Sequence, residues 1–416
     1  MATTDFLVIG GGVLGISIAR QLKRECGDSS VTVIEKEPAC GLHASGRNSG
    51  VLHAGFYYPA ESRKAKYTRC GNKLLTDYCL TKQLPINRCG KLVVARTQAD
   101  HAGLDELCRR GAANGVELEG LSEDDVRLLE PRAKTHERAL YSPATATVDP
   151  MAVMRALTAD ARHEGVNLAC GVRYIGRHGR GYRTSAATYH AGYVVNAAGL
   201  YADRIARDFG FAQQYRVLPF KGLYLYSDHP AECVHVNIYP VPDLRMPFLG
   251  VHVTRTATGQ TKIGPTAIPA LWREQYAGFT NFRFSELVDL TLRHVEMLAL
   301  GGPNYARLAV GEVRKYSRSR LAALASSLMT GVRQERYAWC MAGIRAQLVD
   351  IRRRTLELDF VLEGDDRSMH VLNAVSPGFT CAMPFAEEVC EAIAEATTAR
   401  TNPRGARAVS TGDAVR

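Results

Sequence analysis

The chain has 416 residues, 46% of them apolar, and a formal net charge of +10. This length is large for one ordinary domain and suits two, and the apolar content suffices for substantial cores, so we expect a soluble globular protein. The basic residues are dispersed, with clusters only at 314–320, 352–354 and in the C-terminal tail. Because such runs are usually solvated faces, we predict no nucleic-acid partner. A positive potential also attracts a dianionic small acid or an anionic membrane surface, so a peripheral contact with the inner membrane face stays open.

The sequence offers no membrane span and no metal site. No run of eighteen apolar residues occurs, and the start MATTDFLVIG passes directly into a strand, so we expect no signal peptide and a cytoplasmic location. The eleven cysteines contain no CxxC pair. We therefore predict reduced thiols without zinc or a disulfide framework.

The first thirty-five residues predict a dinucleotide-binding unit. Strand 6–9 leads into Gly10-Gly11-Gly12-Val13-Leu14-Gly15, then a helix, then strand 31–34 ending in Glu35. Gly10 permits the tight turn, Gly12 lets backbone amides approach a pyrophosphate, and Gly15 lets the helix lie close to the strand. The Glu35 carboxylate is spaced to accept hydrogen bonds from the adenosine ribose and would repel a 2′-phosphate, which disfavours NADP.

The next elements follow from periodicity and turn residues. Residues 41–55 are too irregular for a strand and predict a loop against a ligand. They are followed by a helix at 64–80, a strand at 90–95, a helix at 99–114 and a polar helical segment ending near Pro131.

From residue 148 the pattern returns to α/β. We predict a helix at 151–164, strands at 166–172 and 191–196, and an antiparallel sheet over 215–264. Helices at 285–298 and 318–328, strands at 356–362 and 370–374, and a helix at 382–396 complete the predicted elements. The small-residue loop Ala197-Ala198-Gly199 after a buried strand is a second place where a nucleotide can pass close to backbone.

One histidine stands out as a candidate base. His53 lies in Ser45-Gly46-Arg47-Asn48-Ser49-Gly50-Val51-Leu52-His53-Ala54-Gly55, where small residues would let a flat ring approach the backbone. Its unperturbed pKa near 6.5 suits removal of a hydroxyl proton at neutral pH. The alternative is a histidine that is simply hydrogen-bonded inside a loop.

Further donors come from the middle and the end of the chain. Lys221, Tyr239 and His252 lie among predicted strands, although each could equally be a strand-edge residue with its polar tip in water. Arg345 could bind a carboxylate bidentately. The turn Ser376-Pro377-Gly378-Phe379-Thr380 precedes the last helix, whose positive end would stabilise charge developing on a flavin.

Together these motifs resemble the L-2-hydroxyglutarate dehydrogenase/oxidase family of glycine-oxidase-like FAD oxidoreductases. The resemblance rests on the fingerprint, GRNSGVLHAGFYY, PFKG, NIYPVPD with PFLGVH, GIRAQ and NAVSPGFT, in order from about residue 5 to 395. It implies bound FAD and oxidation of L-2-hydroxyglutarate to 2-oxoglutarate, with His53 accepting the hydroxyl proton while C2 delivers hydride to N5. The implied substrate ligands are Arg345 with Tyr239 for one carboxylate, and Lys221 with His252 for the other.

The predicted cofactor contacts extend over the whole chain. They are Gly10, Gly12, Gly15, Glu35, Ser45, Arg47, Asn48, Ser49, Val172, Ala198, Gly199, Gly343, Gly378, Phe379 and Thr380. The chain departs from the family in CMAGIRAQ for PAGVRAQ, NAVSPGFTC for NAPSPAATS, and PFKG for PFRG. Phe379 is larger than the usual alanine and could narrow the pocket or change oxygen access, so a close 2-hydroxy acid remains an alternative substrate.

The expected architecture is α/β plus α+β: a Rossmann-like FAD-binding domain with an inserted, mostly antiparallel substrate domain. We place the discontinuous FAD-binding domain at 1–85, 148–212 and 335–396, the substrate domain at 86–147 and 213–334, and a disordered tail at 397–416. The alternatives are an amine or amino-acid oxidase of the same fold, a flavin-binding protein without turnover, and an NAD-dependent enzyme. The electron acceptor is a quinone, oxygen or another carrier.

Overall fold

The computed structural model describes residues 2–244 and 249–401, and the chain forms two compact units. Unit 1 comprises Met1–Gly46, Val153–Val217 and Ala346–Arg416, and unit 2 comprises Arg47–Ala152 and Leu218–Arg345. Residues 47–85 and 335–345, which the sequence assigned to the FAD-binding domain, therefore lie in unit 2. The first of these stretches belongs there because β3 (Val51–Leu52) pairs with β8 (Ala146–Val148), which also pairs with β4 (Ile86–Asn87).

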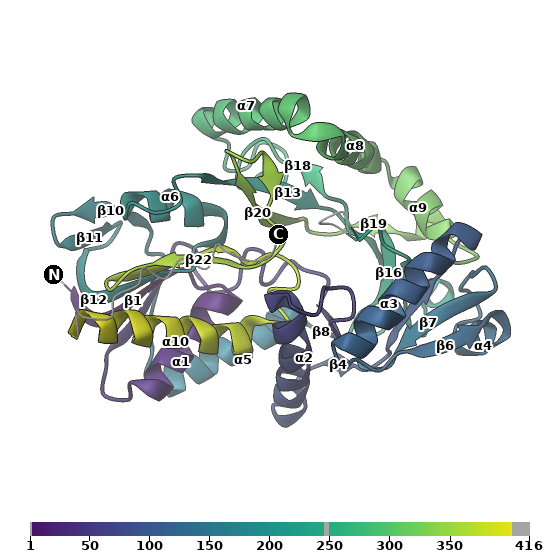
Figure 1. Cartoon of the computed structure of the whole chain (residues 1–416), viewed down its shortest axis with the longest axis horizontal. Helices are drawn as coiled ribbons and strands as arrows, with labels where there is room; N and C mark the ends of the chain where they lie inside the picture. Colours follow the sequence, from purple (N-terminus) through teal and green to yellow (C-terminus); the bar gives the residue numbers. More distant parts are fainter. Residues whose placement is uncertain (1, 245–248, 402–416) are drawn as a thin grey trace. The chain divides into compact units, whose positions relative to one another are not determined.

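Unit 1 is built on a sheet whose central strands are parallel (Figure 1). Its strands are β1 (Ala2–Ile9), β2 (Val31–Glu35), β9 (Asn167–Cys170), β10 (Tyr174–His178), β11 (Gly181–Thr184), β12 (Thr188–Asn196), β22 (Val361–Gly364) and β23 (Ser368–Asn373). Strand β1 pairs in parallel with β2 and β12, and β12 pairs in parallel with β23. Every residue of β2 and of β23 is buried, as expected for strands covered on both faces.

Helices of unit 1 cover this sheet. They are α1 (Val13–Glu25), α6 (Ala202–Asp208), α10 (Ala382–Thr401) and α5 (Pro150–His163), the last of which begins in unit 2. Helix α1 packs on α10, and Arg20 of α1 pairs with Asp160 and Glu164. The predicted Rossmann-like α/β architecture is confirmed.

Unit 2 is built on a mostly antiparallel sheet, which like that of unit 1 has eight strands. The strand order is β19 (Ala338–Trp339), β14 (Leu225–Ser227), β17 (Thr261–Gly264), β16 (His252–Arg255), β15 (Asn237–Pro240), β5 (Lys91–Val94), β7 (Arg138–Ser142) and β6 (Glu119–Ser122). The pairing of β15 with β5 is parallel, which corrects the expectation of an antiparallel sheet at that point. The reason is that β15 pairs with a strand from far earlier in the chain as well as with its neighbour β16.

The remaining strands and the helices complete the two units. Strand β13 (Tyr215–Gly222) pairs with β18 (Ile268–Pro269), and β20 (Gly343–Asp350) pairs with β21 (Thr355–Leu356). The helices of unit 2 are α2 (Arg63–Thr81), α3 (His101–Ala113), α4 (Glu123–Leu129), α7 (Phe284–Leu300), α8 (Gly302–Val313) and α9 (Arg318–Ser326). Ser62 caps α2 by accepting the Ala65 amide, and Ser122 with Asp125 forms a capping box on α4.

Three local predictions were wrong. The strand expected at 356–362 is interrupted, because the Glu357 and Asp359 carbonyls accept hydrogen bonds from the Asn373 side-chain amide instead of a neighbouring strand. Helix α8 was missed because its sequence begins Gly-Pro and contains Gly311. The predicted tail starts too early, since α10 continues through Thr401, and the Thr397 and Thr398 hydroxyls bond back to the Ile393 and Ala394 carbonyls. Residues 402–416 lie outside the described residues.

Candidate active site

The glycine-rich turn of unit 1 has the geometry that its sequence predicts. Gly10 has φ +113°, and a Cβ there would lie 2.5 Å from the Ala197 carbonyl oxygen. A Cβ on Gly15 would lie 1.9 Å from the Gly10 carbonyl oxygen, so only glycine lets α1 approach the turn. Gly12 is the N-cap of α1 and brings no side-chain acceptor to the helix N–H groups, and the first turn of α1 holds no acidic residue. The helix end is therefore suited to an anion such as a pyrophosphate.

Glu35 ends β2 beside this turn. One carboxylate oxygen accepts the Gly11 amide at 2.7 Å, and the other accepts the Glu37 amide at 2.9 Å. These bonds hold the carboxylate, which is 8% exposed, at the end of the strand. Ionised carboxylate oxygens have several lone-pair sites, so each oxygen can still accept a hydroxyl donor.

Other predicted cofactor residues of unit 1 lie in the loops that follow its strands. The Ser45 hydroxyl accepts the Val13 amide of α1 at 2.9 Å, and the Val172 amide donates to the Glu35 carbonyl at 2.8 Å. Ala198 and Gly199 follow β12, where the Ala198 amide donates to the buried Asn196 side chain at 3.2 Å and Gly199 has φ +52°. The sequence did not single out Asn196, although it anchors this loop by also donating to the Ala202 carbonyl.

The turn before α10 is tightly built. A Cβ on Gly378 would lie 2.2 Å from the Ala374 carbonyl oxygen, so glycine is required there by the turn itself. Phe379 is partly exposed, and Thr380 is buried. The side chain of Phe379 is thus partly accessible to solvent.

Four predicted cofactor residues belong to unit 2. Asn48 accepts the Gly50 amide at 2.8 Å, Ser49 accepts the Val51 amide at 3.3 Å, and the Arg47 guanidinium lies over the Tyr276 ring at 4.4 Å. A Cβ on Gly343 would lie 2.3 Å from the Arg47 carbonyl oxygen. The glycine at 343 therefore lets the two backbone segments approach each other.

His53 lies directly after β3 in unit 2 and is 6% exposed. The side-chain amide of Asn72, on α2, donates to the backbone carbonyls of Leu52, His53 and Ala144 at 3.0, 3.2 and 3.1 Å. Burial, and then the positive charges of Lys91, His252 and Arg345, hold the pKa of His53 well below its ordinary value of 6.5. His53 is therefore neutral at physiological pH, as a general base must be.

Lys91 is the residue that the sequence prediction missed. It begins β5, its side chain is fully buried, and its Nζ lies 3.5 Å from Nδ1 of His53. Nζ also lies 4.4, 4.8 and 5.3 Å from the ring centres of Tyr239, Tyr57 and Phe56. Within the described chain no carboxylate pairs with it. Burial lowers the pKa of Lys91 to about 7, so its amine and ammonium forms coexist near neutral pH.

Tyr239 and His252 stack on each other beside Lys91, with ring centres 3.8 Å apart. The hydroxyls of Tyr57 and Tyr239 are buried and have no hydrogen-bond partner among residues 2–244 and 249–401. Nδ1 of His252 donates to the Gly250 carbonyl at 2.9 Å, and burial lowers the pKa of His252 to about 3. His252 is thus neutral with an unprotonated Nε2, which suits a hydroxyl donor better than a carboxylate.

The two remaining predicted substrate ligands differ in their placement. Arg345 is half-buried and close enough to His53 and His252 to lower the pKa of both. Lys221 is 8% exposed on β13, and burial lowers its pKa. In the part of the chain that the structure describes, none of the contacts within the His53 cluster involves the Lys221 side chain. The structure thus gathers His53, Tyr239, His252 and Arg345, with Lys91 added.

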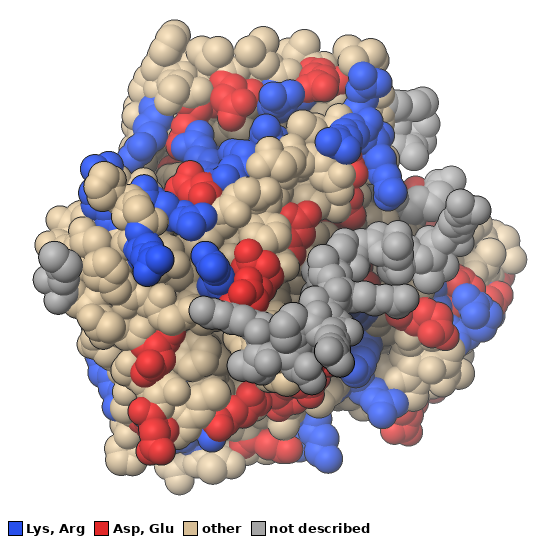
Figure 2. All heavy atoms as spheres, turned by 60° about the vertical axis from the view of Figure 1, so that its left-hand side comes forward, with Lys and Arg blue, Asp and Glu red and all other residues tan. Residues whose placement is uncertain are grey.

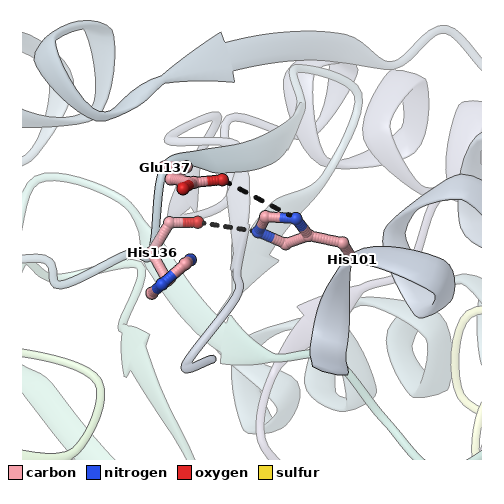
Figure 3. Close-up of side chains that lie close together, drawn as sticks. All are labelled: His101, His136 and Glu137. Carbon is pink, nitrogen blue, oxygen red and sulfur yellow. Dashed lines mark hydrogen bonds and ion pairs between the residues drawn. The ribbon is translucent and has the colours of Figure 1, made fainter. Parts of the chain in front are cut away.

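A second group of ionisable side chains lies in unit 2, at the start of α3 (Figure 3). Nε2 of His101 donates to the His136 carbonyl at 3.0 Å, and Nδ1 lies 3.9 Å from a carboxylate oxygen of Glu137 (Figure 3). His136 and Glu137 are exposed, and Arg138 also donates to the His101 carbonyl. This arrangement is an ion pair when His101 is protonated, and the prediction that the protein binds no metal stays a prediction.

The surface carries charged side chains of both signs. Figure 2 shows lysine and arginine side chains interspersed with aspartate and glutamate on one face. None of the helices within residues 2–244 and 249–401 has the length and apolar character that crossing a membrane needs. The cysteines form no disulfide within these residues.

Comparison with known proteins identifies the family. The model of the FAD dependent oxidoreductase family matches residues 5–392. The L-2-hydroxyglutarate dehydrogenase of Escherichia coli K12 is 31% identical over 99% of this chain and 98% of its own length, and the mitochondrial human L-2-hydroxyglutarate dehydrogenase is 33% identical over 94% and 88%. This chain belongs to the L-2-hydroxyglutarate dehydrogenase family of FAD-dependent oxidoreductases.

Solved structures agree at the level of the fold. The L-alpha-glycerophosphate oxidase of Mycoplasma pneumoniae, solved with FAD bound, superposes with a TM-score of 0.75 at 20% identity, covering 99% of this chain and 97% of that one. The glycine oxidase of Geobacillus kaustophilus gives a TM-score of 0.69 at 18% identity, with 95% of each chain covered. The predicted fold class and family are confirmed, and the protein is an oxidoreductase with FAD as its cofactor.

The residues of unit 1 fit this cofactor. The pyrophosphate site is supplied by the close backbone approach at Gly10 and Gly15 and by the α1 end, which has no acidic residue. The ribose site is supplied by the fixed Glu35 carboxylate. In particular, a Cβ on Gly12 would lie 3.1 Å from the Ser45 hydroxyl and close the space beside the helix end.

Proposed function

We propose that this protein oxidises L-2-hydroxyglutarate, or a close 2-hydroxy acid, to 2-oxoglutarate or the corresponding 2-oxo acid. Two curated relatives with this activity in their names match nearly the whole chain. The observation that supports the chemistry is a neutral, buried histidine grouped with an arginine and a buried lysine in unit 2. Such a group can remove a hydroxyl proton and bind a carboxylate.

In this proposal Nε2 of His53 accepts the proton of the substrate hydroxyl. Bound FAD supplies the two-electron acceptor, to which C2 of the substrate passes a hydride. A protonated His53 would be poorly stabilised, because burial and the nearby positive charge of Arg345 disfavour a charge on its ring. A second acceptor next to His53 would therefore help the reaction.

We assign that role to Lys91, which acts through His53 and does not contact the substrate. As Nε2 takes the hydroxyl proton, the proton on Nδ1 passes to the neutral amine of Lys91, 3.5 Å away. His53 ends neutral with its proton on Nε2, and Lys91 ends as an ammonium. The rings of Phe56, Tyr57 and Tyr239 favour that cation through their π faces.

The same cluster offers ligands for the substrate acid. Arg345 can hold one carboxylate bidentately, and the Tyr239 hydroxyl can donate to it. The unprotonated Nε2 of His252 makes this residue an acceptor, so we assign the second carboxylate to Lys221 alone. Phe379 is the position at which we expect the acid preference to be set, because the family resemblance implies a smaller residue there.

Anaerobic mixing tests the proposed activity. The FAD-loaded protein is mixed with L-2-hydroxyglutarate, D-2-hydroxyglutarate, L-lactate or glycine, and the flavin absorbance is followed. We expect rapid bleaching with the first compound only. Bleaching by glycine or another amino acid, but by no hydroxy acid, would replace the proposal by an amine oxidase. Absence of bleaching with every compound would indicate a flavin-binding protein without turnover.

The electron acceptor is tested on the reduced protein. Adding oxygen, a soluble quinone or an artificial carrier to the bleached sample shows which restores the flavin absorbance fastest. We propose a quinone or another carrier rather than oxygen as the physiological acceptor, in keeping with the word dehydrogenase in the names of the relatives.

A further inference from the structure

Two histidines and a glutamate of unit 2 form a group of potential metal ligands (Figure 3). His101 is the first residue of α3, and His136 and Glu137 lie in the loop that precedes β7. One ring nitrogen of each histidine and one carboxylate oxygen of Glu137 all lie within 4.8 Å of one another. We call these three residues the histidine–glutamate cluster. In the described parts of the chain, its hydrogen bond, ion pair and ring contact involve none of the residues grouped around His53.

The ring of His101 is held in one orientation. It is 8% exposed, and its Nε2 donates to the His136 backbone carbonyl at 3.0 Å. Nδ1 of the neutral ring therefore carries a lone pair, and it lies 3.9 Å from a carboxylate oxygen of Glu137 (Figure 3). Two acceptors that face each other need a proton or a metal ion between them. A backbone carbonyl on the other ring nitrogen is the usual way in which proteins orient a metal-binding histidine.

Backbone hydrogen bonds hold the loop that carries the other two ligands. The His136 amide donates to the Ala95 carbonyl at 2.8 Å, and the Arg138 amide donates to the His136 carbonyl at 2.7 Å. This tight turn gives Glu137 a φ of +62°, which a residue with a side chain rarely adopts. The side chains of His136 and Glu137 are exposed, so they can rotate toward an ion without a change in the backbone.

The required movement is small. Zinc–ligand bonds of about 2.0–2.1 Å in a tetrahedral site place the ligand atoms about 3.3 Å apart. Because the three ligand atoms are already within 4.8 Å of one another, each separation has to close by at most about 1.5 Å.

The two exposed ligands are available for an ion. Within residues 2–244 and 249–401, the His136 ring nitrogens make no hydrogen bond, and the Glu137 carboxylate makes no ion pair except that with His101. Arg138 follows Glu137 in the chain, but its guanidinium pairs with Asp105 at 2.9 Å. The charge of this arginine is therefore matched elsewhere, and the carboxylate of Glu137 supplies a negative charge for a cation.

We propose that the histidine–glutamate cluster is a binding site for a divalent metal ion of the zinc class. Two imidazole nitrogens with one carboxylate oxygen suit zinc and its first-row neighbours better than Mg²⁺ or Ca²⁺. Three protein ligands leave a position that water completes. The bound ion ties the loop before β7 to the start of α3. The sequence predicted no metal, because His101 and His136 are 35 residues apart and form no recognisable motif. The inference does not depend on the proposed substrate.

Equilibrium dialysis against Zn²⁺ tests this site, with the FAD-loaded full chain carrying no affinity tag and freed of metal by EDTA. We expect the wild type to bind a Zn²⁺ ion that excess Mg²⁺ does not displace. H136N/E137Q should raise the dissociation constant of this ion by about tenfold or more, because loss of even an outer-shell partner costs about 10–100-fold in metal affinity. H101N should weaken binding at least as much.

The matched control is H178N/E117Q, which replaces an exposed histidine and an exposed glutamate elsewhere in the described chain. It should bind Zn²⁺ like the wild type, and all variants should keep FAD and the metal-free melting temperature. Wild-type protein that binds no Zn²⁺, unchanged binding by H136N/E137Q, or equal losses in H136N/E137Q and H178N/E117Q would each overturn the proposal. The metal-free wild type should still reduce its flavin with substrate, so failure of this site and failure of the proposed function are distinguishable.

Discussion

The Nζ atom of Lys91 lies 3.5 Å from Nδ1 of His53, and both side chains are buried in unit 2. Lys91 pairs with no carboxylate in the described parts of the chain, 2–244 and 249–401, and such a buried lysine is costly because burial disfavours its charge. Because burial favours the neutral amine, Lys91 could accept a proton from the neighbouring His53.

Replacing Lys91 should change both the rate of flavin reduction and its dependence on pH. In the wild type the rate should rise with pH to a plateau, with an inflection near 7, because only the neutral amine accepts a proton. K91M should lower the plateau by about 10–100-fold and remove this inflection. K91R, whose side chain is permanently charged, should restore neither the plateau rate nor the inflection. Anaerobic stopped-flow absorbance measures these rates.

A double-variant cycle separates this role from a structural one. If Lys91 acts through His53, K91M should add little further loss on top of H53N. If the two single losses of rate instead multiply in H53N/K91M, the proton transfer from His53 to Lys91 is contradicted. The control is K64M, since Lys64 is a second buried lysine close to an aromatic ring. Its pH profile should match the wild type.

Lys91 should also leave a signature in stability. Its pKa is about 7 when folded and 10.5 in the reference state, so between these values the unfolded chain binds the extra proton. Its contribution to the free energy of unfolding therefore increases as pH rises from 7 to 10.5, and the penalty is complete below pH 7. K91M should raise the free energy of unfolding at pH 6 by on the order of 3 kcal/mol, with a gain that shrinks toward pH 10.

Melting temperatures of the FAD-loaded wild type and K91M over pH 6–9.5 check this sign. Two results would contradict this sign: a K91M protein that melts lower than the wild type at pH 6, or a difference in melting temperature that is the same at every pH. Either would show that Lys91 is not held near its neutral form by burial.

Asn72 should prove to be a positioning residue for His53. Its side-chain amide donates to three backbone carbonyls, including that of His53, and it is buried. N72A leaves these carbonyls without their donor, so we expect a loss of about 1–3 kcal/mol in the free energy of unfolding. The rate of flavin reduction should fall while its pH inflection stays near 7. A shifted inflection would mean that Asn72 acts on the titrating pair itself.

Arg345 should contribute mainly to binding the substrate acid. A lysine at this position keeps the charge but loses the bidentate geometry, so R345K should raise KM by about tenfold or more with a smaller effect on kcat. R345M should raise KM further. Steady-state rates with an artificial acceptor measure both, and an unchanged KM in R345M would remove Arg345 from the substrate site.

Much of unit 1 could be predicted from the sequence because its constraints are local. The turn at Gly10 and the contact at Gly15 both need glycine, and both positions can be recognised from the glycine spacing within residues 10–15. The end of β2 at Glu35 follows from the apolar strand before it. Helix α8 could not be predicted, because its Gly-Pro start and its internal glycine give the segment a low helix propensity. The helix forms because tertiary packing outweighs that propensity.

The cluster around His53 was predicted only in part. Tyr239, His252 and Arg345 were found through motifs, but Lys91 was not, because a lysine at the start of a strand is normally solvated. Lys91 and Tyr239 are far apart in the sequence, and the parallel pairing of β5 with β15 brings them together. The role of Asn72 depends on three carbonyls from two distant segments, which no sequence spacing reveals.

The most direct test of the account is single-turnover flavin reduction by L-2-hydroxyglutarate in the wild type and in H53N. The asparagine keeps a polar side chain but cannot accept the hydroxyl proton, so we predict a rate about 10²–10⁴-fold lower with FAD content unchanged. H101N, in a second buried histidine of unit 2, should react like the wild type. An H53N protein whose flavin bleaches at the wild-type rate would contradict the central claim that His53 accepts the proton.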